Sequence, residues 1–278
     1  MNNFITAIVR LYYMFLFILS NKKNIKLNKK KVFFNFSRKY FHLGDELFFW
    51  PTILWLESKN YEIKINSSKL ILKKFPSINY KEDGIFLIRP DCYIPGTISL
   101  NVWKGDDKIA KDIFFNSCRF LNIDVSDTNY HEACKLLREI LFGIKNTKLV
   151  KKFEFTKKNF NIISSEIDSG KWRYFGTFSK IVSSLCKNID VNSINIHIGK
   201  KPIKAKLAVD IHQDLGGTTN MHELIYLLSS KNVINVYTFD TIVYHIAFLL
   251  NKKTICQQRK WIYQRKSQQI QRRFIPAF

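Results

Sequence analysis

The chain contains the run Phe239-Asp240-Thr241-Ile242-Val243-Tyr244-His245-Ile246-Ala247-Phe248-Leu249-Leu250, which follows an apolar segment at Val233–Tyr237. The earlier segment predicts a strand, and the apolar run after Thr241 predicts a helix. In an α/β sheet, ligands sit at the carboxyl ends of strands and at helix N-termini, where free N–H groups favour anions. The junction is therefore a candidate diphosphate or sugar-nucleotide site. The same residues also fit a buried turn in which Asp240 or Thr241 caps the helix and His245 is a core histidine.

Strand-like and helix-like segments alternate along most of the chain, which indicates parallel βαβ units. Strands are predicted at Val32–Phe36, Glu62–Ile65, Ile85–Ile88, Phe160–Ser164, Ile194–Ile198, Ala208–Asp210 and Val233–Tyr237. Helices are predicted at Leu47–Leu56, Ile109–Leu121, His131–Phe142 and Phe178–Leu185. A basic stretch at Lys145–Lys152 suits a linker between two α/β domains, 32–150 and 151–256. They are flanked by an apolar and basic segment at 1–31 and a basic tail at 257–278.

A second motif precedes the first one. Gly216-Gly217-Thr218-Thr219-Asn220 leads into an apolar helix at Leu224–Leu228, and Glu223 stands three residues after Asn220. This spacing predicts a capping box at the start of that helix.

Together, the two motifs resemble the heptosyltransferase family, the family 9 glycosyltransferases, which has Gly-x-Thr-Ser-x-x-Glu-Leu before Asp-Ser/Thr-Gly-x-x-His-x-Ala. The opening strand followed by Gly44-Asp45 and Pro51 resembles that family's first junction. Lys171-Trp172, after the strand at Phe160–Ser164, resembles its Lys-x-Trp or Lys-Trp-Pro element. The resemblance implies a GT-B arrangement, in which two Rossmann-like domains face each other across a cleft.

The resemblance also implies a function. The second domain would hold a nucleotide-activated sugar, such as a heptose, and the first a lipopolysaccharide-type or other cell-surface glycan acceptor. Transfer would invert the anomeric carbon, with the donor as a substrate and no cofactor or metal. Asp45 would be the catalytic base and Lys171 would neutralise diphosphate charge. The donor would be bound by Thr218, Thr219, Asp240, Thr241, Ile242, Val243 and His245.

Each of these assignments has a structural alternative. Asp45 also suits the N-cap of the following helix, and Lys171 a solvated surface position. The chain departs from the family pattern at two places. Ile242 stands where the family has Gly, and Lys200-Lys201 stand where the family usually has an acidic residue. An inactive relative that acts as a scaffold is therefore the alternative within the family.

The composition limits the classes of partner that we expect for this chain. The net charge of +23 favours an anionic partner, although a chain rich in Lys, Asn, Ile and Phe also acquires Lys from AT-rich coding. A basic nucleic-acid-binding protein is the alternative class, but most aromatic residues lie within apolar runs, so nucleic acid is not the expected partner. Five scattered cysteines and the absence of Cys-x-x-Cys indicate a reducing compartment, hence the cytoplasm.

The N-terminal segment bears on localisation. The apolar run Phe4–Leu19 is too short for a transmembrane span and is followed by six lysines between residues 22 and 31. This pattern predicts peripheral association with the anionic inner face of the cytoplasmic membrane. A helix packed on the protein itself is the alternative.

Overall fold

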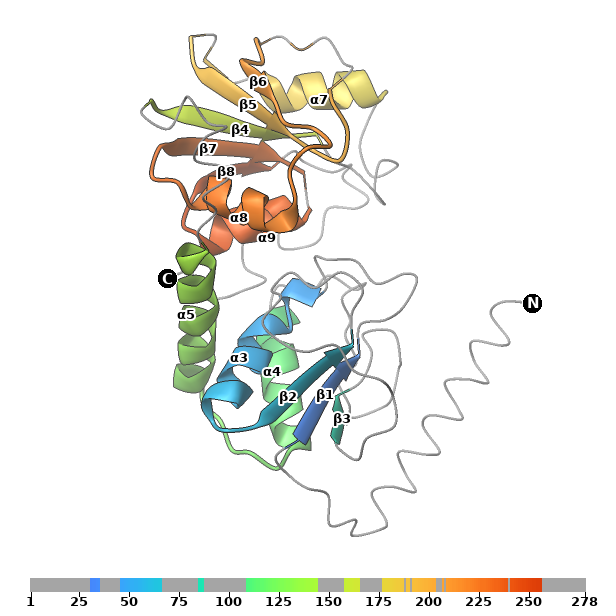
Figure 1. The fold of residues 1–278 in the computed structure, drawn as a ribbon, viewed down its shortest axis with the longest axis vertical. Helices are drawn as coiled ribbons and strands as arrows, with labels where there is room; N and C mark the ends of the chain where they lie inside the picture. Colours follow the sequence, from blue (N-terminus) through green and yellow to red (C-terminus); the bar gives the residue numbers. More distant parts are fainter. Residues whose placement is uncertain are drawn as a thin grey trace, which may run out of the picture. The chain divides into compact units, whose positions relative to one another are not determined.

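The computed structural model describes residues 31–35, 46–66, 85–87, 109–144, 158–165, 177–187, 189–190, 192–203, 207, 209–239 and 241–256. The chain divides into two compact units, one formed mainly by residues up to Leu137 and the other mainly by residues from Arg138 onward. Both units are mixed α/β structures with parallel sheets, as the alternating sequence pattern predicts (Figure 1).

The sheet of the first unit has the order β2-β1-β3, and both strand pairings are parallel. Its strands are β1 (Lys31–Asn35), β2 (Glu62–Asn66) and β3 (Ile85–Leu87). Parallel neighbours need a crossover connection, and helix α3 (Trp50–Ser58) supplies it between β1 and β2. Helices α4 (Ile109–Phe120) and α5 (Asp127–Gly143) follow β3.

Helix α3 begins three residues later than the sequence predicts. A tight turn, in which Phe49 N–H donates to the Glu46 carbonyl at 3.0 Å, occupies the residues before it. Pro51 then fits the first helical turn, because its missing N–H has no intrahelical partner to lose there. Nearly all of the helix is buried, and its Trp55 ring meets the Phe114 ring edge-on at 5.1 Å.

The second unit is a five-stranded parallel sheet with the order β6-β5-β4-β7-β8. Its strands are β4 (Phe160–Ser164), β5 (Ile194–Ile198), β6 (Gln213–Asp214), β7 (Val233–Thr238) and β8 (Lys253–Cys256). Its helices are α7 (Phe178–Cys186), α8 (Met221–Ser229) and α9 (Ile242–Leu249). The chain builds the sheet outward in one direction from β4 and then in the other from β7, so the strand order reverses between these two strands.

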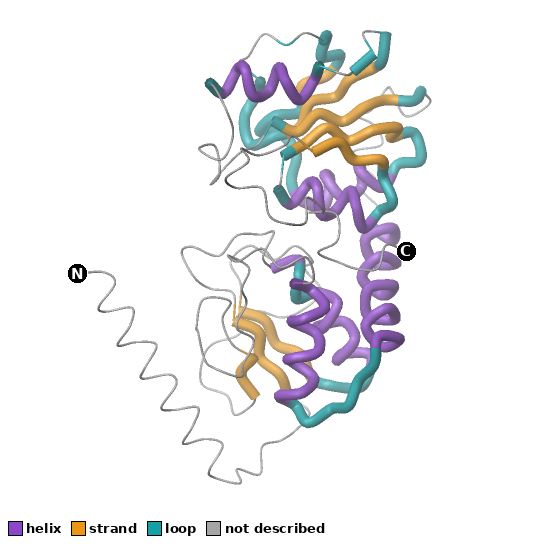
Figure 2. The backbone as a smooth tube through the Cα atoms, turned by 180° about the vertical axis from the view of Figure 1, so that it is seen from behind, coloured by secondary structure: helices purple, strands orange, loops and turns teal. Residues whose placement is uncertain are grey.

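Helices cover both faces of this sheet (Figures 1 and 2). Helix α7 packs on one face, where Ile181, Val182 and Leu185 join Ile163 and Tyr237 in a buried core. Helices α8 and α9 lie on the other face, and both contact β7. Strands buried on both faces carry few charges, and the burial of all five residues of β4 agrees with this.

A ladder of amide side chains crosses the α7 face of the sheet. Asn235 Nδ2 donates to Asn161 Oδ1 at 2.9 Å, and Asn161 Nδ2 donates to Asn195 Oδ1 at 3.1 Å. Asn195 Nδ2 then donates to the Asp210 carbonyl at 3.0 Å. Because each bond joins neighbouring strands or the loop beside them, these hydrogen bonds form in only one register of β7, β4 and β5.

One predicted strand of the second unit was wrong, and one strand was not predicted. Val209 and Asp210, within the strand predicted at Ala208–Asp210, are not in a strand, and β6 lies at Gln213–Asp214 instead. It is a two-residue edge strand that pairs only with β5, so it lacks the apolar run that marks a doubly covered strand. The strand β8 was not predicted.

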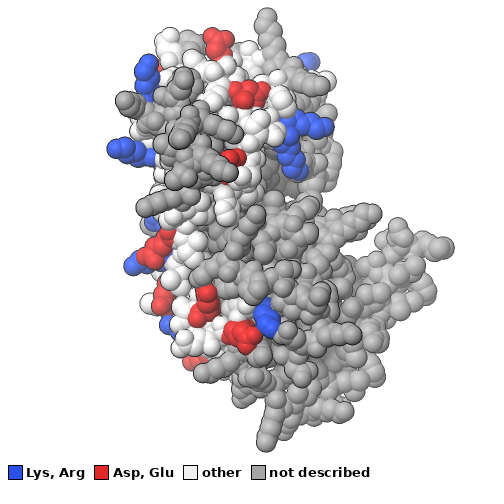
Figure 3. Space-filling view, in the orientation of Figure 1, with Lys and Arg blue, Asp and Glu red and all other residues white. Residues whose placement is uncertain are grey.

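Within the part of the chain that the structure describes, no helix is long and apolar enough to cross a membrane. The segment Phe4–Lys31 is almost entirely outside the described residues. Among the described residues on the face drawn in Figure 3, Lys and Arg side chains are scattered between acidic and neutral ones.

Candidate functional site

The carboxyl edge of the second sheet gathers the loops that follow its strands. In doubly wound sheets, the strand-order reversal leaves a crevice outside the carboxyl ends of the two strands that flank it. Here these strands are β4, which ends at Ser164, and β7, which ends at Thr238. Both residues are fully buried.

Helix α9 begins beside this reversal, and no side chain among the described residues caps it. Its N-cap residue, Thr241, is extended and makes no capping hydrogen bond, and its N–H donates to the Phe239 carbonyl at 2.7 Å. The Thr241 hydroxyl instead lies 3.4 Å from that of Thr238. The first N–H groups of an α-helix have no intrahelical acceptor, so this helix start suits an anionic group.

Helix α8 begins in the opposite way. Asn220 Oδ1 accepts from Glu223 N–H, and Glu223 Oε2 accepts from Asn220 N–H, both at 2.9 Å. This capping box confirms the prediction made from the spacing of the two residues. The box satisfies two N–H groups and adds a carboxylate. The N-terminus of α8 is therefore less suited to bind an anion than that of α9.

A close turn ties the loop after β5 to the loop after β6. Gly217, with φ of 77°, donates its N–H to the Gly199 carbonyl at 2.7 Å. A Cβ on Gly216 would overlap the carbonyl of Lys201 and lie 2.7 Å from Pro202 Cα. Only glycine allows this approach, which fixes Lys200 and Lys201 at the carboxyl edge.

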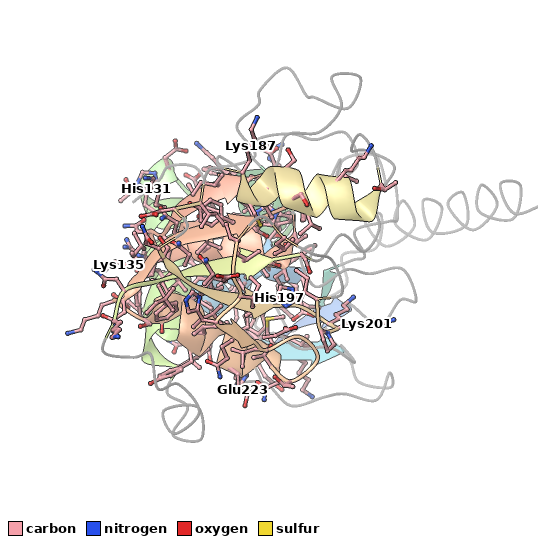
Figure 4. All side chains as sticks on the ribbon, turned by 90° about the horizontal axis from the view of Figure 1, so that it is seen from above. His131, Lys135, Lys187, His197, Lys201 and Glu223 are labelled. Carbon is pink, nitrogen blue, oxygen red and sulfur yellow. The ribbon has the colours of Figure 1, made fainter. Side chains whose placement is uncertain are left out.

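Three side chains form a continuous hydrogen-bonded chain across β4, β5 and β6. His197 Nδ1 lies 2.6 Å from Asp214 Oδ1, and His197 Nε2 lies 2.7 Å from the hydroxyl oxygen of Ser165. The His197 side chain is fully buried, whereas that of Asp214 is 29% exposed. Figure 4 shows His197 within the sheet and Lys201 on the loop beyond β5.

The carboxylate of Asp214 also accepts from two backbone groups. Gly216 N–H donates to Oδ1 and Ile203 N–H donates to Oδ2, both at 2.8 Å. Partial burial acts to raise the pKa of Asp214, but the hydrogen bonds from His197, Gly216 and Ile203 outweigh it, so the pKa lies below its usual value. Asp214 is therefore ionised at neutral pH.

The structure describes six of the nine predicted site residues; Asp45, Lys171 and Asp240 lie outside the described part. Thr241 and Ile242 are half-buried at the start of α9, and Val243 is buried. His245 is also buried, 4% exposed, and its ring meets the Tyr244 ring edge-on at 5.3 Å. Thr218 is exposed and its hydroxyl donates to the Leu215 carbonyl at 2.9 Å, while Thr219 is half-buried.

Thr218 and Thr241 lie at the same edge of the sheet but are not neighbours. Thr218 follows β6 and Thr241 follows β7, and β5 and β4 stand between these strands. Three strand spacings correspond to roughly 14 Å. One phosphate group therefore cannot contact both residues directly, whereas an extended ligand can reach them with different parts.

The chain from Ser165 to Asp214 was not predicted from the sequence. The strand pairing gives the signal: Ile163 pairs with His197, and His197 with Asp214, so Ser165 lies on the same face as His197. Because the strand after Ile194–Ile198 was predicted at Ala208–Asp210, Asp214 was expected in a loop.

No group of three or more His, Cys, Asp and Glu side chains among the described residues is arranged to hold a metal ion. The metal independence of the expected reaction stays a prediction. Comparisons of the chain with protein-family models, with curated proteins and with solved structures gave no match.

Proposed function

We propose that the second unit binds a nucleotide-activated sugar at its carboxyl edge and that the protein is an inverting glycosyltransferase. The observation that carries the proposal is the uncapped start of α9 beside the strand-order reversal between β4 and β7. A helix N-terminus at such a reversal suits a diphosphate, because its N–H groups and its dipole both favour negative charge. The resemblance to the heptosyltransferase family, which includes this junction, supports a sugar nucleotide as the source of that diphosphate.

The ligand would extend along the edge of the sheet. Its diphosphate would bind at Thr241, Ile242 and Val243, and another part would reach toward Thr218 and Thr219. The roughly 14 Å between the two sites matches an extended nucleotide sugar better than a single phosphate. Lys200 and Lys201, which the Gly216 turn holds at this edge, would add positive charge near the ligand.

The chemistry would be a single displacement at the anomeric carbon. Asp45 would take the proton of the acceptor hydroxyl, while Lys171 and the N-terminus of α9 would stabilise the departing diphosphate. The first unit would hold a lipopolysaccharide-type or other cell-surface glycan in a GT-B arrangement. No metal is required if the lysine and the helix N-terminus neutralise the diphosphate.

A thermal-shift screen of ADP-, UDP-, GDP- and CMP-linked sugars tests the binding. A ligand at 100 times its Kd should raise the free energy of unfolding by about 2.7 kcal/mol. Lys171→Ala should weaken binding by about 1.5–3 kcal/mol. Lys187→Ala is the matched control, because Lys187 is exposed just after the C-terminal end of α7, at the opposite edge of the sheet.

Two outcomes would point elsewhere. A shift with none of the four nucleotide classes would contradict the donor site and favour a scaffold. Salt-sensitive binding of a fluorescent single-stranded oligonucleotide, without sugar-nucleotide binding, would favour a nucleic-acid-binding protein. If a donor binds, Asp45→Asn should keep the binding but lower turnover by on the order of 10²–10⁴-fold.

We propose that the segment Phe4–Lys31 holds the protein on an anionic membrane surface. The apolar run would enter the interface, and the lysines after it would contact acidic headgroups. Flotation with vesicles of phosphatidylcholine and phosphatidylglycerol should recover the protein at low salt and less of it at high salt. Equal recovery with vesicles of phosphatidylcholine alone would contradict the proposal.

A further inference from the structure

The hydrogen-bond chain from Ser165 to Asp214 fixes the direction in which its protons point. A carboxylate only accepts hydrogen bonds, so His197 Nδ1 must donate to Asp214 across the 2.6 Å contact. In the neutral imidazole, Nε2 is then unprotonated, and it accepts the hydroxyl proton of Ser165 across the 2.7 Å contact. A serine, an oriented histidine and an ionised aspartate are thereby in the order that nucleophilic catalysis requires.

We propose that Ser165 is the nucleophile of a second catalytic site, which acts on carboxylic esters and does not depend on glycosyl transfer. His197 is the general base and Asp214 orients it. The two backbone N–H groups that also donate to Asp214, from Ile203 and Gly216, hold the carboxylate in place.

The reaction requires only the ester and one water molecule. Ser165 Oγ forms a bond to the ester carbonyl carbon while its proton passes to His197 Nε2. The bond from that carbon to the alcohol oxygen breaks, and the departing alcohol takes the proton from His197. Water then attacks the acyl-serine in the same way, which releases the carboxylic acid and restores Ser165. Asp214 stays ionised throughout.

Ser165 lies at the edge of the sheet where ligands bind, although only 6% of the residue is exposed there. Ser165 directly follows β4, so it lies at the carboxyl edge next to the strand-order reversal. The other neighbour of β4 is β7, and the uncapped first turn of α9 follows β7 at the same edge. Its N–H groups are the candidates for stabilising the oxyanion that forms when the ester carbonyl is attacked.

Labelling with a biotinylated fluorophosphonate tests the proposal on the full chain, because this reagent modifies activated serine nucleophiles. We expect one label, located on Ser165 by peptide mass spectrometry, and loss of labelling in 8 M urea. His197→Gln should lower the labelling rate by on the order of 10²–10⁴-fold, with the melting temperature measured to verify that the variant is folded.

Ser164 supplies the matched control. It is adjacent to Ser165 and fully buried, but its hydroxyl has no hydrogen-bond partner among the described residues. Ser164→Ala should therefore leave the label on Ser165 unchanged. No label on Ser165 in the wild-type chain, under conditions in which trypsin is fully labelled, would overturn the proposal. A label on Ser164 or on another serine instead would overturn it as well. Neither result depends on whether a sugar nucleotide binds.

Discussion

Asn161 and Asn195 join the two strands at the centre of the second sheet through their side chains as well as their backbones. Asn161 Nδ2 donates to Asn195 Oδ1 at 3.1 Å, and both residues are almost fully buried. Asn161 also accepts from Asn235 Nδ2 at 2.9 Å, so it is the central member of the ladder. Buried amides in a sheet core are costly unless each is satisfied, so the ladder depends on all of its members.

Asn161→Ala should destabilise the second unit. The substitution leaves Asn195 Oδ1 and Asn235 Nδ2 without their partners, and each buried unsatisfied group costs about 1–3 kcal/mol. We expect a loss of roughly 2–5 kcal/mol in the free energy of unfolding, measured by urea denaturation. Asn192→Ala, at an exposed position of the same unit, should change it by less than about 0.5 kcal/mol. Equal losses in the two variants would show that the ladder contributes nothing.

Asp214→Asn should destabilise the fold in a pH-dependent way. Asn can accept at one position only, so its amide group would meet a backbone N–H or the His197 Nδ1–H instead of accepting from it. Because the folded-state pKa of Asp214 is lowered, its stabilisation is fully present above the unfolded value of about 3.9 and is lost as the pH falls through the folded pKa.

Urea denaturation at several pH values measures this effect. The difference in unfolding free energy between wild type and Asp214→Asn should be constant near neutral pH and shrink below about pH 4. Asp190→Asn is the control, because Asp190 is exposed and accepts one backbone hydrogen bond, which an asparagine can also accept. A difference for Asp214→Asn that grows on acidification would contradict the assignment.

Gly216→Ala should disturb the turn that joins the loops after β5 and β6. The added methyl group would overlap the Lys201 carbonyl, which is backbone and cannot rotate away. We expect a destabilisation of about 1–3 kcal/mol, measured by thermal unfolding. Gly143→Ala is the matched control, since a Cβ there meets nothing within 4 Å. If both variants melt at the same temperature, the loop after β5 does not pack as tightly as described.

Three cysteines should resist alkylation in the folded protein. Burial raises the pKa of Cys118 and Cys134 to about 12 and that of Cys186 to about 11, so few thiolates are present at pH 8. Cys256 is half-buried. Among the four cysteines that the structure describes, iodoacetamide followed by peptide mass spectrometry should label Cys256 first and the other three only in urea. Rapid labelling of Cys134 in the native protein would contradict the burial of that side chain.

The sequence predicts the α/β class and most of the elements in the described residues, because apolar runs mark strands that are covered on both faces. The capping box was predicted as well, since the partners Asn220 and Glu223 are only three residues apart. Local spacing carries no comparable information about β6, a polar edge strand with two residues. The placement of Ser165, His197 and Asp214 depends on the register of three strands, so it could not be read before that register was known.

The hydrogen bonds of Asp214 make two distant segments open together. Ile203 and Gly216 are separated by twelve residues in the chain, yet both N–H groups end on one carboxylate. Neither amide can exchange its hydrogen with solvent unless its bond to that carboxylate breaks, and the Gly216 backbone lies close against the Lys201 carbonyl. The two loops therefore form a single cooperative opening unit, and any motion that displaces Lys200 and Lys201 also changes the surroundings of His197.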